Sequence, residues 1–162
     1  MKFRCERDVL VEALAAASRV TSGRERLPVL AGARMSVTGD ELKIIATDLD
    51  LTIEVVATVA GIADGVAVIP AKLAADIVRS LEPGAVTVEA DPDQAKIASG
   101  RSQFAVRVLP AEEFPMPQSG IVGDDVKVAS GELANALRQV VRAASNDEAR
   151  PILTGVLFMA TA

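Results

Sequence analysis

The chain repeats part of itself. Residues 3–36 and 126–159 align without a gap at an offset of 123. The matched positions of the first copy are Leu10, Ala13, Leu14, Arg19, Ser22, Glu25, Pro28, Leu30 and Gly32, which recur as Leu133, Ala136, Leu137, Arg142, Ser145, Glu148, Pro151, Leu153 and Gly155. Two unrelated amphipathic helices can share leucine and alanine positions, but not also a following Glu, Pro and Gly. We therefore expect a whole structural unit to be copied, and the chain to be a piece of a longer modular protein.

Composition limits the chemistry that the chain can perform. Half of its 162 residues are hydrophobic and 24% are charged, so it can bury a core of one complete domain and part of a second. Cys5 is the sole cysteine and histidine is absent, which excludes an internal disulfide, Cys/His zinc sites and catalysis through a histidine base. The N-terminus does not resemble a signal peptide and no long apolar run is present, so we expect a cytoplasmic protein.

The order of expected elements is itself repeated within the first 110 residues. A strand over 2–5, a helix from an N-cap at Asp8 to about residue 21, and strands over 29–37, 42–46 and 51–60 form the first half. The second half has a strand over 66–69, a helix over 70–81, and strands over 85–90, 95–99 and 103–108. This pattern predicts an α+β fold with two β-α-β-β-β units per domain and helices on one face of antiparallel sheets.

Domain boundaries follow from proline content and the repeat. Segment 109–122 holds three prolines and is interpreted as a linker. The first domain is then expected over 1–120, and 123–162 is expected to begin a second, truncated domain.

Charge is distributed unevenly although the net charge is −5. Acidic residues lie at expected turns, whereas basic residues concentrate on the helices and the loop after the first helix: Arg19, Arg24, Arg26, Lys72, Arg79, Arg138 and Arg142. Helices that share one face would make that face attractive to a polyanion within an acidic protein. The alternative is that these side chains only solubilise the helices.

Several short segments together resemble one known family. They are the start MKFRCER, Leu27-Pro28-Val29-Leu30, Ala46-Thr47-Asp48-Leu49, Gly100-Arg101-Ser102, and Leu109-Pro110-Ala111-Glu112-Glu113-Phe114-Pro115. In their order and spacing they resemble the bacterial sliding clamp, the beta subunit of DNA polymerase III. The resemblance implies a DNA-clamp fold, three domains per chain, and two chains closed head to tail around duplex DNA with the helices lining the hole. It implies no chemistry and no cofactor, only a non-catalytic subunit of the polymerase holoenzyme.

The resemblance also assigns residues. It places basic side chains toward DNA at Arg24, Lys72, Arg79, Arg142 and Arg150. Asp147 stands where many clamps carry a neutral or basic residue, and Pro151-Ile152 replace aromatic residues of many relatives, so the contact of that loop with DNA is an open question. The ring joint is assigned to Lys72, Leu73, Ile77, Arg101, Gln103 and Val106, with Ile77 equally compatible with plain core.

Protein partners follow from the same resemblance. The polymerase and the clamp loader are implied to bind a pocket to which this chain contributes Leu153. With the remainder of the pocket and the third domain beyond Ala162, the fragment is expected neither to bind such peptides well nor to close a ring.

Two other functions compete with the clamp. The first is an enzyme, because Asp48, Asp50 and Glu54 could form the cluster of carboxylates that a hydrolase or a Mg²⁺ site needs. The alternative role for these three residues is turn capping or solvated charge at a strand edge. A protein-binding scaffold would use the same domain without encircling DNA.

Overall fold

The structure divides the chain into two units. It is a computed structural model that describes residues 1–21, 27–116, 126–147 and 149–159. The first unit is Met1–Gln118 and the second is Ser119–Ala162. Each unit is described by itself.

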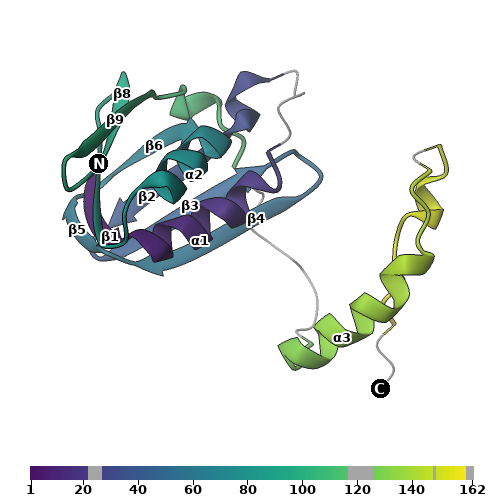
Figure 1. Cartoon of the computed structure of the whole chain (residues 1–162). Coiled ribbons are helices and arrows are strands. Elements are labelled where there is room, and N and C mark those ends of the chain that lie inside the picture. The colour runs from purple at the N-terminus through teal and green to yellow at the C-terminus, as the bar shows by residue number, and fades with distance from the viewer. Residues whose placement is uncertain (22–26, 117–125, 148, 160–162) are drawn as a thin grey trace. The chain divides into compact units, whose positions relative to one another are not determined.

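The strands of the first unit form two antiparallel sheets (Figure 1). The five-stranded sheet has the order β5-β1-β7-β8-β9, and the four-stranded sheet has the order β4-β3-β2-β6. The bounds of the first sheet are β5 Ala60–Ala63, β1 Lys2–Glu6, β7 Ala85–Ala90, β8 Gln94–Ser99 and β9 Ser102–Arg107. Those of the second are β4 Thr52–Thr58, β3 Glu41–Thr47, β2 Gly32–Thr38 and β6 Gly65–Pro70.

Each half of the unit places its first strand in the sheet of the other half. β1, which opens the first half, pairs with β7 of the second half, and β6, which opens the second half, pairs with β2 of the first. Each exchanged strand also has a partner on its other side. β1 pairs there with β5, and Val68 of β6 forms an isolated β-bridge with Leu109. The predicted α+β fold with two β-α-β-β-β units is confirmed, and the exchange of first strands interlocks the two units.

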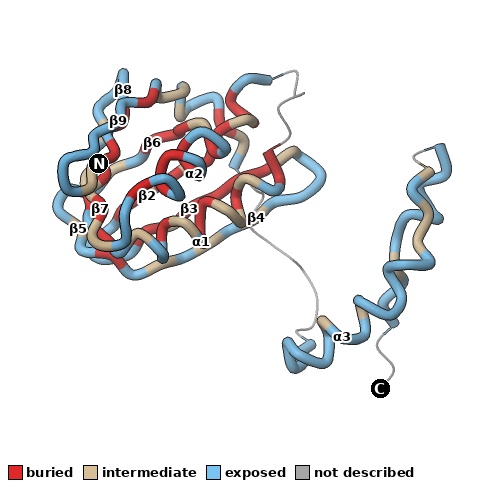
Figure 2. Tube along the Cα trace, in the orientation of Figure 1, coloured by how far each residue is buried: buried red, intermediate tan, exposed pale blue. Residues whose placement is uncertain are grey.

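Two helices cover the same side of the unit and lie next to each other (Figure 1). They are α1 (Arg7–Ser18) and α2 (Ala71–Ser80). Their apolar sides are buried between helix and sheet (Figure 2), as the helical spacing predicts, with Leu10, Ala13, Leu14 and Ala17 on α1 and Ala71, Ala74, Ala75, Ile77 and Val78 on α2.

The predicted N-cap of α1 is wrong. Glu6 is the N-cap residue and its side chain makes no capping hydrogen bond, while Asp8 lies inside the first turn. There its negative charge stabilises the N-terminal end of the helix dipole, and its carboxylate forms an ion pair with Arg7. The helix also ends at Ser18, before the expected residue 21.

A second, smaller core lies apart from the main one and corrects two expectations. Val29, Leu30, Ile45, Val68 and Phe114 form it. The 3₁₀ helix η1 (Pro28–Ala31) occupies the start of the expected strand 29–37, because Pro28 opens a tight turn whose Leu30 N–H bonds to the Leu27 carbonyl. The 3₁₀ helix η2 (Ala111–Glu113) and Phe114, which is 4% exposed, pack as part of the first unit, so the first six residues of the expected linker are not linker.

The expected strand 51–60 divides into β4 and β5 at a crowded corner. Asp40, in the β2–β3 turn, accepts a hydrogen bond from the Gly61 N–H through Oδ1 at 3.0 Å and one from the Val59 N–H through its carbonyl at 2.9 Å. Asp64 Oδ1 accepts one from the Gly39 N–H at 2.9 Å. A Cβ at Gly61 would overlap the carbonyl oxygen of Gly39, so only glycine fits where the turn meets β5.

The second unit reproduces the first α-helix and the first 3₁₀ helix of the first unit at the same offset of 123. The helix α3 (Ser130–Val140) corresponds to α1, and the 3₁₀ helix η4 (Pro151–Leu153) corresponds to η1. In the parts of 126–159 that the structure describes, no strand corresponds to β1 or β2. The partners of those strands in the first copy, β5, β7, β3 and β6, correspond to positions beyond Ala162. Leu133, the counterpart of the buried Leu10, is accordingly 36% exposed.

The close approach at Gly61 predicts a measurable loss of stability. Gly61→Ala is expected to lower the free energy of unfolding by about 3 kcal/mol, because either the turn or β5 must shift to admit the methyl group. Gly131→Ala is the matched control, because a Cβ there meets no heavy atom within 4 Å. Urea unfolding of the two variants and the wild type measures the difference. Equal midpoints for all three would show that the corner is not rigid.

Candidate nucleic-acid interface and sheet edge

The basic residues of α2 differ in how far they are available to a ligand. Lys72 is exposed at the start of the helix and makes no ion pair with the described residues. Arg79, in the last turn, pairs through Nη1 with Oδ1 of Asp76 at 2.9 Å. An exposed pair three residues apart on one helix is weak, but it leaves little net charge at that position. Of the two predicted DNA-facing residues on α2, Lys72 therefore presents the more open positive charge.

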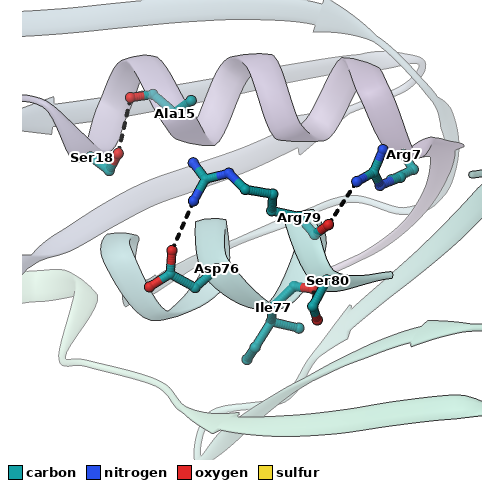
Figure 3. A network of polar contacts seen from close by, with 7 residues as sticks. All are labelled: Arg7, Ala15, Ser18, Asp76, Ile77, Arg79 and Ser80. Carbon is teal, nitrogen blue, oxygen red and sulfur yellow. Dashed lines mark hydrogen bonds and ion pairs between the residues drawn. The ribbon is translucent and has the colours of Figure 1, made fainter. Parts of the chain in front are cut away.

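Arg7 joins the two helices (Figure 3). From the first turn of α1 its Nη2 donates to the Arg79 carbonyl at 2.6 Å and its Nε donates to the Val78 carbonyl at 3.4 Å, while Nη1 pairs with Asp8 at 2.9 Å. The last carbonyls of a helix lack intrahelical hydrogen-bond donors, and a cation beside them also interacts favourably with the negative end of the helix dipole. Arg7 thus fixes the end of α2 against the start of α1, a role that helical periodicity does not reveal.

In the second unit, the charges of the loop after α3 oppose each other. Arg150 Nε donates to Oδ2 of Asp147 at 2.8 Å. The Oδ1 of Asp147 accepts a hydrogen bond from the Ala149 N–H at 3.0 Å, so this carboxylate also organises the turn. Arg142, in the 3₁₀ helix η3 (Val141–Ala143), is exposed and makes no ion pair among the residues the structure describes. The offset of 123 makes Asp147 the counterpart of Arg24, which itself lies outside the described residues.

Of the predicted ring-joint residues, Gln103 and Val106 lie on β9, the last strand of its sheet, Arg101 lies directly before it, and Lys72, Leu73 and Ile77 lie on α2. Arg101 and Gln103 are exposed, and Leu73 is 49% exposed on α2. Ile77 and Val106 instead belong to the main core, at 9% and 3% exposure. Figure 3 shows Ile77 on the side of α2 that points away from α1, and Leu73, four residues earlier, shares that side of the helix. With the exposed Lys72, the structure therefore divides the predicted set into four exposed residues and two buried ones.

Two further residues were assigned neither a DNA-facing nor a ring-joint role from the sequence. Phe104, in β9, pairs with the buried Ile97 and so lies on the helix-covered face, yet it is 39% exposed because no strand follows β9 in the sheet. Arg19 is exposed at the C-cap of α1 and is the repeat counterpart of Arg142. The repeat was a signal for Arg19, whereas Phe104 needed the strand order.

The carboxylates considered for catalysis have structural contacts. Asp48 Oδ1 accepts hydrogen bonds from the N–H groups of Asp50 and Leu51 at 3.1 and 2.7 Å, which closes the β3–β4 turn. Glu54 pairs with Lys43 at 2.9 Å. No group of three acidic, cysteine or histidine residues positioned for a metal ion occurs in the described part of the chain.

Cys5 is not a reactive thiol. Burial, reinforced by the charge of Glu6, raises the pKa of the Cys5 thiol to about 11, so the nucleophilic thiolate is scarce near neutral pH.

Leu153, the predicted contributor to a peptide pocket, is 47% exposed in η4. Its carbonyl accepts a hydrogen bond from the Ser145 N–H at 2.8 Å, which connects η4 to the end of η3. Across the described helices, none combines the length and the hydropathy needed to cross a bilayer.

Comparison with known proteins identifies the family. The model of the DNA polymerase III beta subunit, N-terminal domain, matches residues 1–118. The chain belongs to this family. A beta sliding clamp of Streptomyces coelicolor is 35% identical over 158 residues, which are 96% of this chain and 41% of that protein. One of Vibrio cholerae is 32% identical, over 98% of this chain and 44% of that protein.

Solved clamp structures share the fold. A pol III beta from Caulobacter crescentus has a TM-score of 0.88 at 33% identity, covering 96% of this chain and 42% of that one. A DNA polymerase sliding clamp from Bacillus subtilis has a TM-score of 0.88 at 29% identity, with 96% and 43% covered. The chain thus spans less than half the length of these clamp relatives, and the similarity extends past residue 118 into the second copy.

The contacts of Arg7 and Arg79 predict different costs for removing each side chain. Arg7→Ala is expected to lower the free energy of unfolding by about 1–2 kcal/mol, because two carbonyls at the end of α2 lose a charged donor. Arg79→Ala removes an exposed ion pair and is expected to cost about 0.5 kcal/mol or less. Thermal or urea unfolding compares the two. Equal costs would mean that Arg7 does not hold the helices together.

Proposed function

We propose that this chain is part of a DNA sliding clamp, a processivity factor that encircles duplex DNA and tethers the replicative polymerase in the cytoplasm. The observation that carries the proposal is the placement of both helices on one side of a unit whose first segment is repeated 123 residues later. Successive units of this kind can line a closed surface with helices while the sheets form its outside. On this proposal the chain performs no chemistry, needs no cofactor, and serves the polymerase as a non-catalytic subunit.

The charges on the helices suit sliding better than tight binding. Lys72 and Arg142 are open to a ligand, whereas Arg79 and Arg150 each share their charge with an aspartate. Each phosphate contact adds a salt-dependent increment to affinity. Of these four described residues only two are open, so together they contribute weak binding. A protein that stays on DNA by encircling it does not need stronger electrostatic binding. Arg24 is proposed to add to this surface from the loop after α1.

The open edge at β9 supports assembly of two chains head to tail. A strand without a neighbour presents unpaired backbone groups to another sheet, and Leu73, Arg101, Gln103 and Phe104 supply exposed side chains beside it. Ile77 and Val106 are proposed to support this surface from beneath. The polymerase and the clamp loader are proposed to bind elsewhere, at a pocket to which Leu153 contributes.

Topological binding is the first test. The protein, as its own gene expresses it, is loaded onto nicked circular DNA and separated by gel filtration. We expect it to elute with circular DNA and to be released when one cut makes the DNA linear, because a ring can then slide off the end. Equal retention on both forms would contradict encirclement and would favour a scaffold that binds DNA or protein directly.

Charge substitution is the second test, made on the present chain with duplex DNA at low salt. Lys72→Glu and Arg142→Glu are each expected to weaken binding and to reduce the slope of log K against log salt by about 1. Asp147→Asn is expected to strengthen binding, because it releases Arg150 from its ion pair. Lys96→Glu, on the face away from the helices, is the control for net charge and is expected to have a smaller effect. Fluorescence anisotropy measures all four; equal effects of Lys72→Glu and Lys96→Glu would show that the helix face is not the DNA-binding surface.

A further inference from the structure

The five-stranded sheet has a face that points away from the helices. On its strands β1, β7, β8 and β9, buried side chains such as Phe3, Val88 and Ile97 belong to the main core. Because successive side chains of a strand alternate between the two faces, the residues between these buried ones form an outer face. It consists of the even-numbered positions of β1 and β8 and the odd-numbered positions of β7 and β9, and none of them is buried.

This outer face is more basic than acidic, although the whole chain has a net charge of −5. Four of its side chains are basic and two are acidic, namely Lys2, Arg4, Lys96 and Arg107 against Glu6 and Glu89. Lys2 forms an ion pair with Glu89 at 3.0 Å. Arg4, Lys96 and Arg107 are exposed and form no ion pair with a residue that the structure describes. Three open cations on one face of an acidic protein favour an anionic partner.

The three open cations form a diagonal across the sheet. Lys96 lies two strands away from Arg4 and one pair of side chains further along the strands, and Arg107 lies one strand and one pair beyond Lys96. Strands are about 4.8 Å apart, and side chains on one face of a strand are about 6.7 Å apart. These spacings give about 12 Å between the Cα atoms of Arg4 and Lys96, and about 8 Å between those of Lys96 and Arg107.

Short side chains surround the diagonal. Thr87, which pairs with Arg4, also pairs with Ala98 on its other side. Ala105 pairs with Lys96. Because none of these three neighbours rises far above the sheet, an extended chain can lie close to its surface while the long basic side chains reach toward it.

The surface is hollow at the Arg4 end of the diagonal. Arg4 lines a polar cavity of about 540 Å³, together with the loop before β7 and the β8–β9 turn. Arg101 and Ser102 add two more hydrogen-bond donors to its lining, and Glu82 is its one carboxylate. Since Arg101 is also a predicted ring-joint residue, Arg4 is the cation we assign to a carboxylate that enters this cavity.

The composition of the outer face favours a peptide over other polyanions. Its positions on β1, β7, β8 and β9, which the structure describes in full, include no aromatic side chain. Single-stranded nucleic acid needs such side chains for base stacking. The same positions include no large apolar side chain that would enter a membrane interface. Carboxylates spaced along a polypeptide are therefore the anions that fit best.

We propose that this outer face binds an acidic, extended segment of a partner protein, which crosses the strands from Arg4 through Lys96 to Arg107. In an extended chain, carboxylates at positions i, i+4 and i+6 face the same side and are about 13 and 7 Å apart. This spacing matches that of the cations, so the recognised pattern is acidic-x-x-x-acidic-x-acidic. The helices lie on the other side of the sheet (Figure 1), so the segment and DNA can bind at the same time, and the proposal does not rest on encirclement of DNA.

A labelled synthetic peptide tests the proposal on the 162-residue chain without DNA. The peptide is built of Ser and Gly with glutamates at positions i, i+4 and i+6. Fluorescence anisotropy is expected to give a dissociation constant of about 100 μM at low salt, and about tenfold weaker binding at about 0.3 M salt because the Debye length shortens. A peptide with three consecutive glutamates is expected to bind at least about threefold more weakly, because its carboxylates alternate between two sides. No binding at about 1 mM peptide, or equal binding of the two peptides, would overturn the proposal.

Charge reversal identifies the surface. Arg4→Glu and Lys96→Glu are each expected to weaken binding of the spaced peptide about tenfold, because each replaces an attraction by a repulsion. Lys127→Glu makes the same change of net charge at an exposed position of the second unit and is the matched control, expected to leave the affinity within about twofold of the wild type. Circular dichroism verifies that each variant is folded. Equal effects of all three substitutions would show that only net charge matters, and would contradict the proposed surface.

Competition with nucleic acid separates this proposal from DNA binding. Saturating duplex DNA is expected to leave the peptide bound, and Arg4→Glu is expected to leave the affinity for duplex DNA unchanged within about twofold, because the two ligands use opposite faces. Displacement of the peptide by the duplex would mean that both use the same cations, which decides against the proposal. Single-stranded oligothymidylate that binds more tightly than the peptide and loses its affinity in Arg4→Glu would assign the outer face to nucleic acid instead.

Discussion

The pairing of β1 with β7, and of β6 with β2, is the constraint on which the rest of the first unit depends. Because each half places its first strand in the other half's sheet, neither half can complete its hydrogen bonding alone. The helix that follows each exchanged strand is thereby placed over the same side of the unit. The two helices come together there, and Arg7 at the start of α1 can reach the last carbonyls of α2. A surface of two neighbouring helices is a consequence of strand exchange.

The same constraint explains why the second unit looks different. Its sequence repeats that of α1 and η1, and these local elements form at the expected offset. Helices and 3₁₀ turns are completed by hydrogen bonds between residues close in sequence. Strands need partners from elsewhere in the chain, and the counterparts of those partners are numbered beyond Ala162. The apolar side of α3 is therefore exposed where that of α1 is buried.

The sheet edges follow from the topology as well. β4 and β9 each lie at one end of their sheets, and β6 and β5 lie at the other ends. Proteins usually protect such edges with charge or by covering them. At β9, the exposed Arg101 and Arg107 supply such charge.

Much of the fold could be predicted from the sequence, and the predictions that were wrong share a cause. Periodicity identified both helices, and the repeat pointed to Arg19 and Arg142 as equivalent positions. The predicted N-cap of α1 was two residues too late, and the predicted linker began too early. Both errors arose because the roles of Asp8 and Phe114 depend on contacts that the local sequence pattern does not encode. The resemblance placed Arg79 and Arg150 toward DNA, and it did not reveal that each forms an ion pair with a neighbouring aspartate.

By itself the sequence determined the period of the unit, the order of its elements and the absence of histidine-based chemistry, since these depend on residue identity and spacing along the chain. Only the tertiary structure decided which strands exchange, which edges remain open, and that Phe104 is half-exposed while Val106, two residues away on the same face, is buried. The physical reason is that helices are stabilised by neighbours in sequence, whereas sheet order and edge exposure arise from hydrogen bonds between segments far apart in the chain.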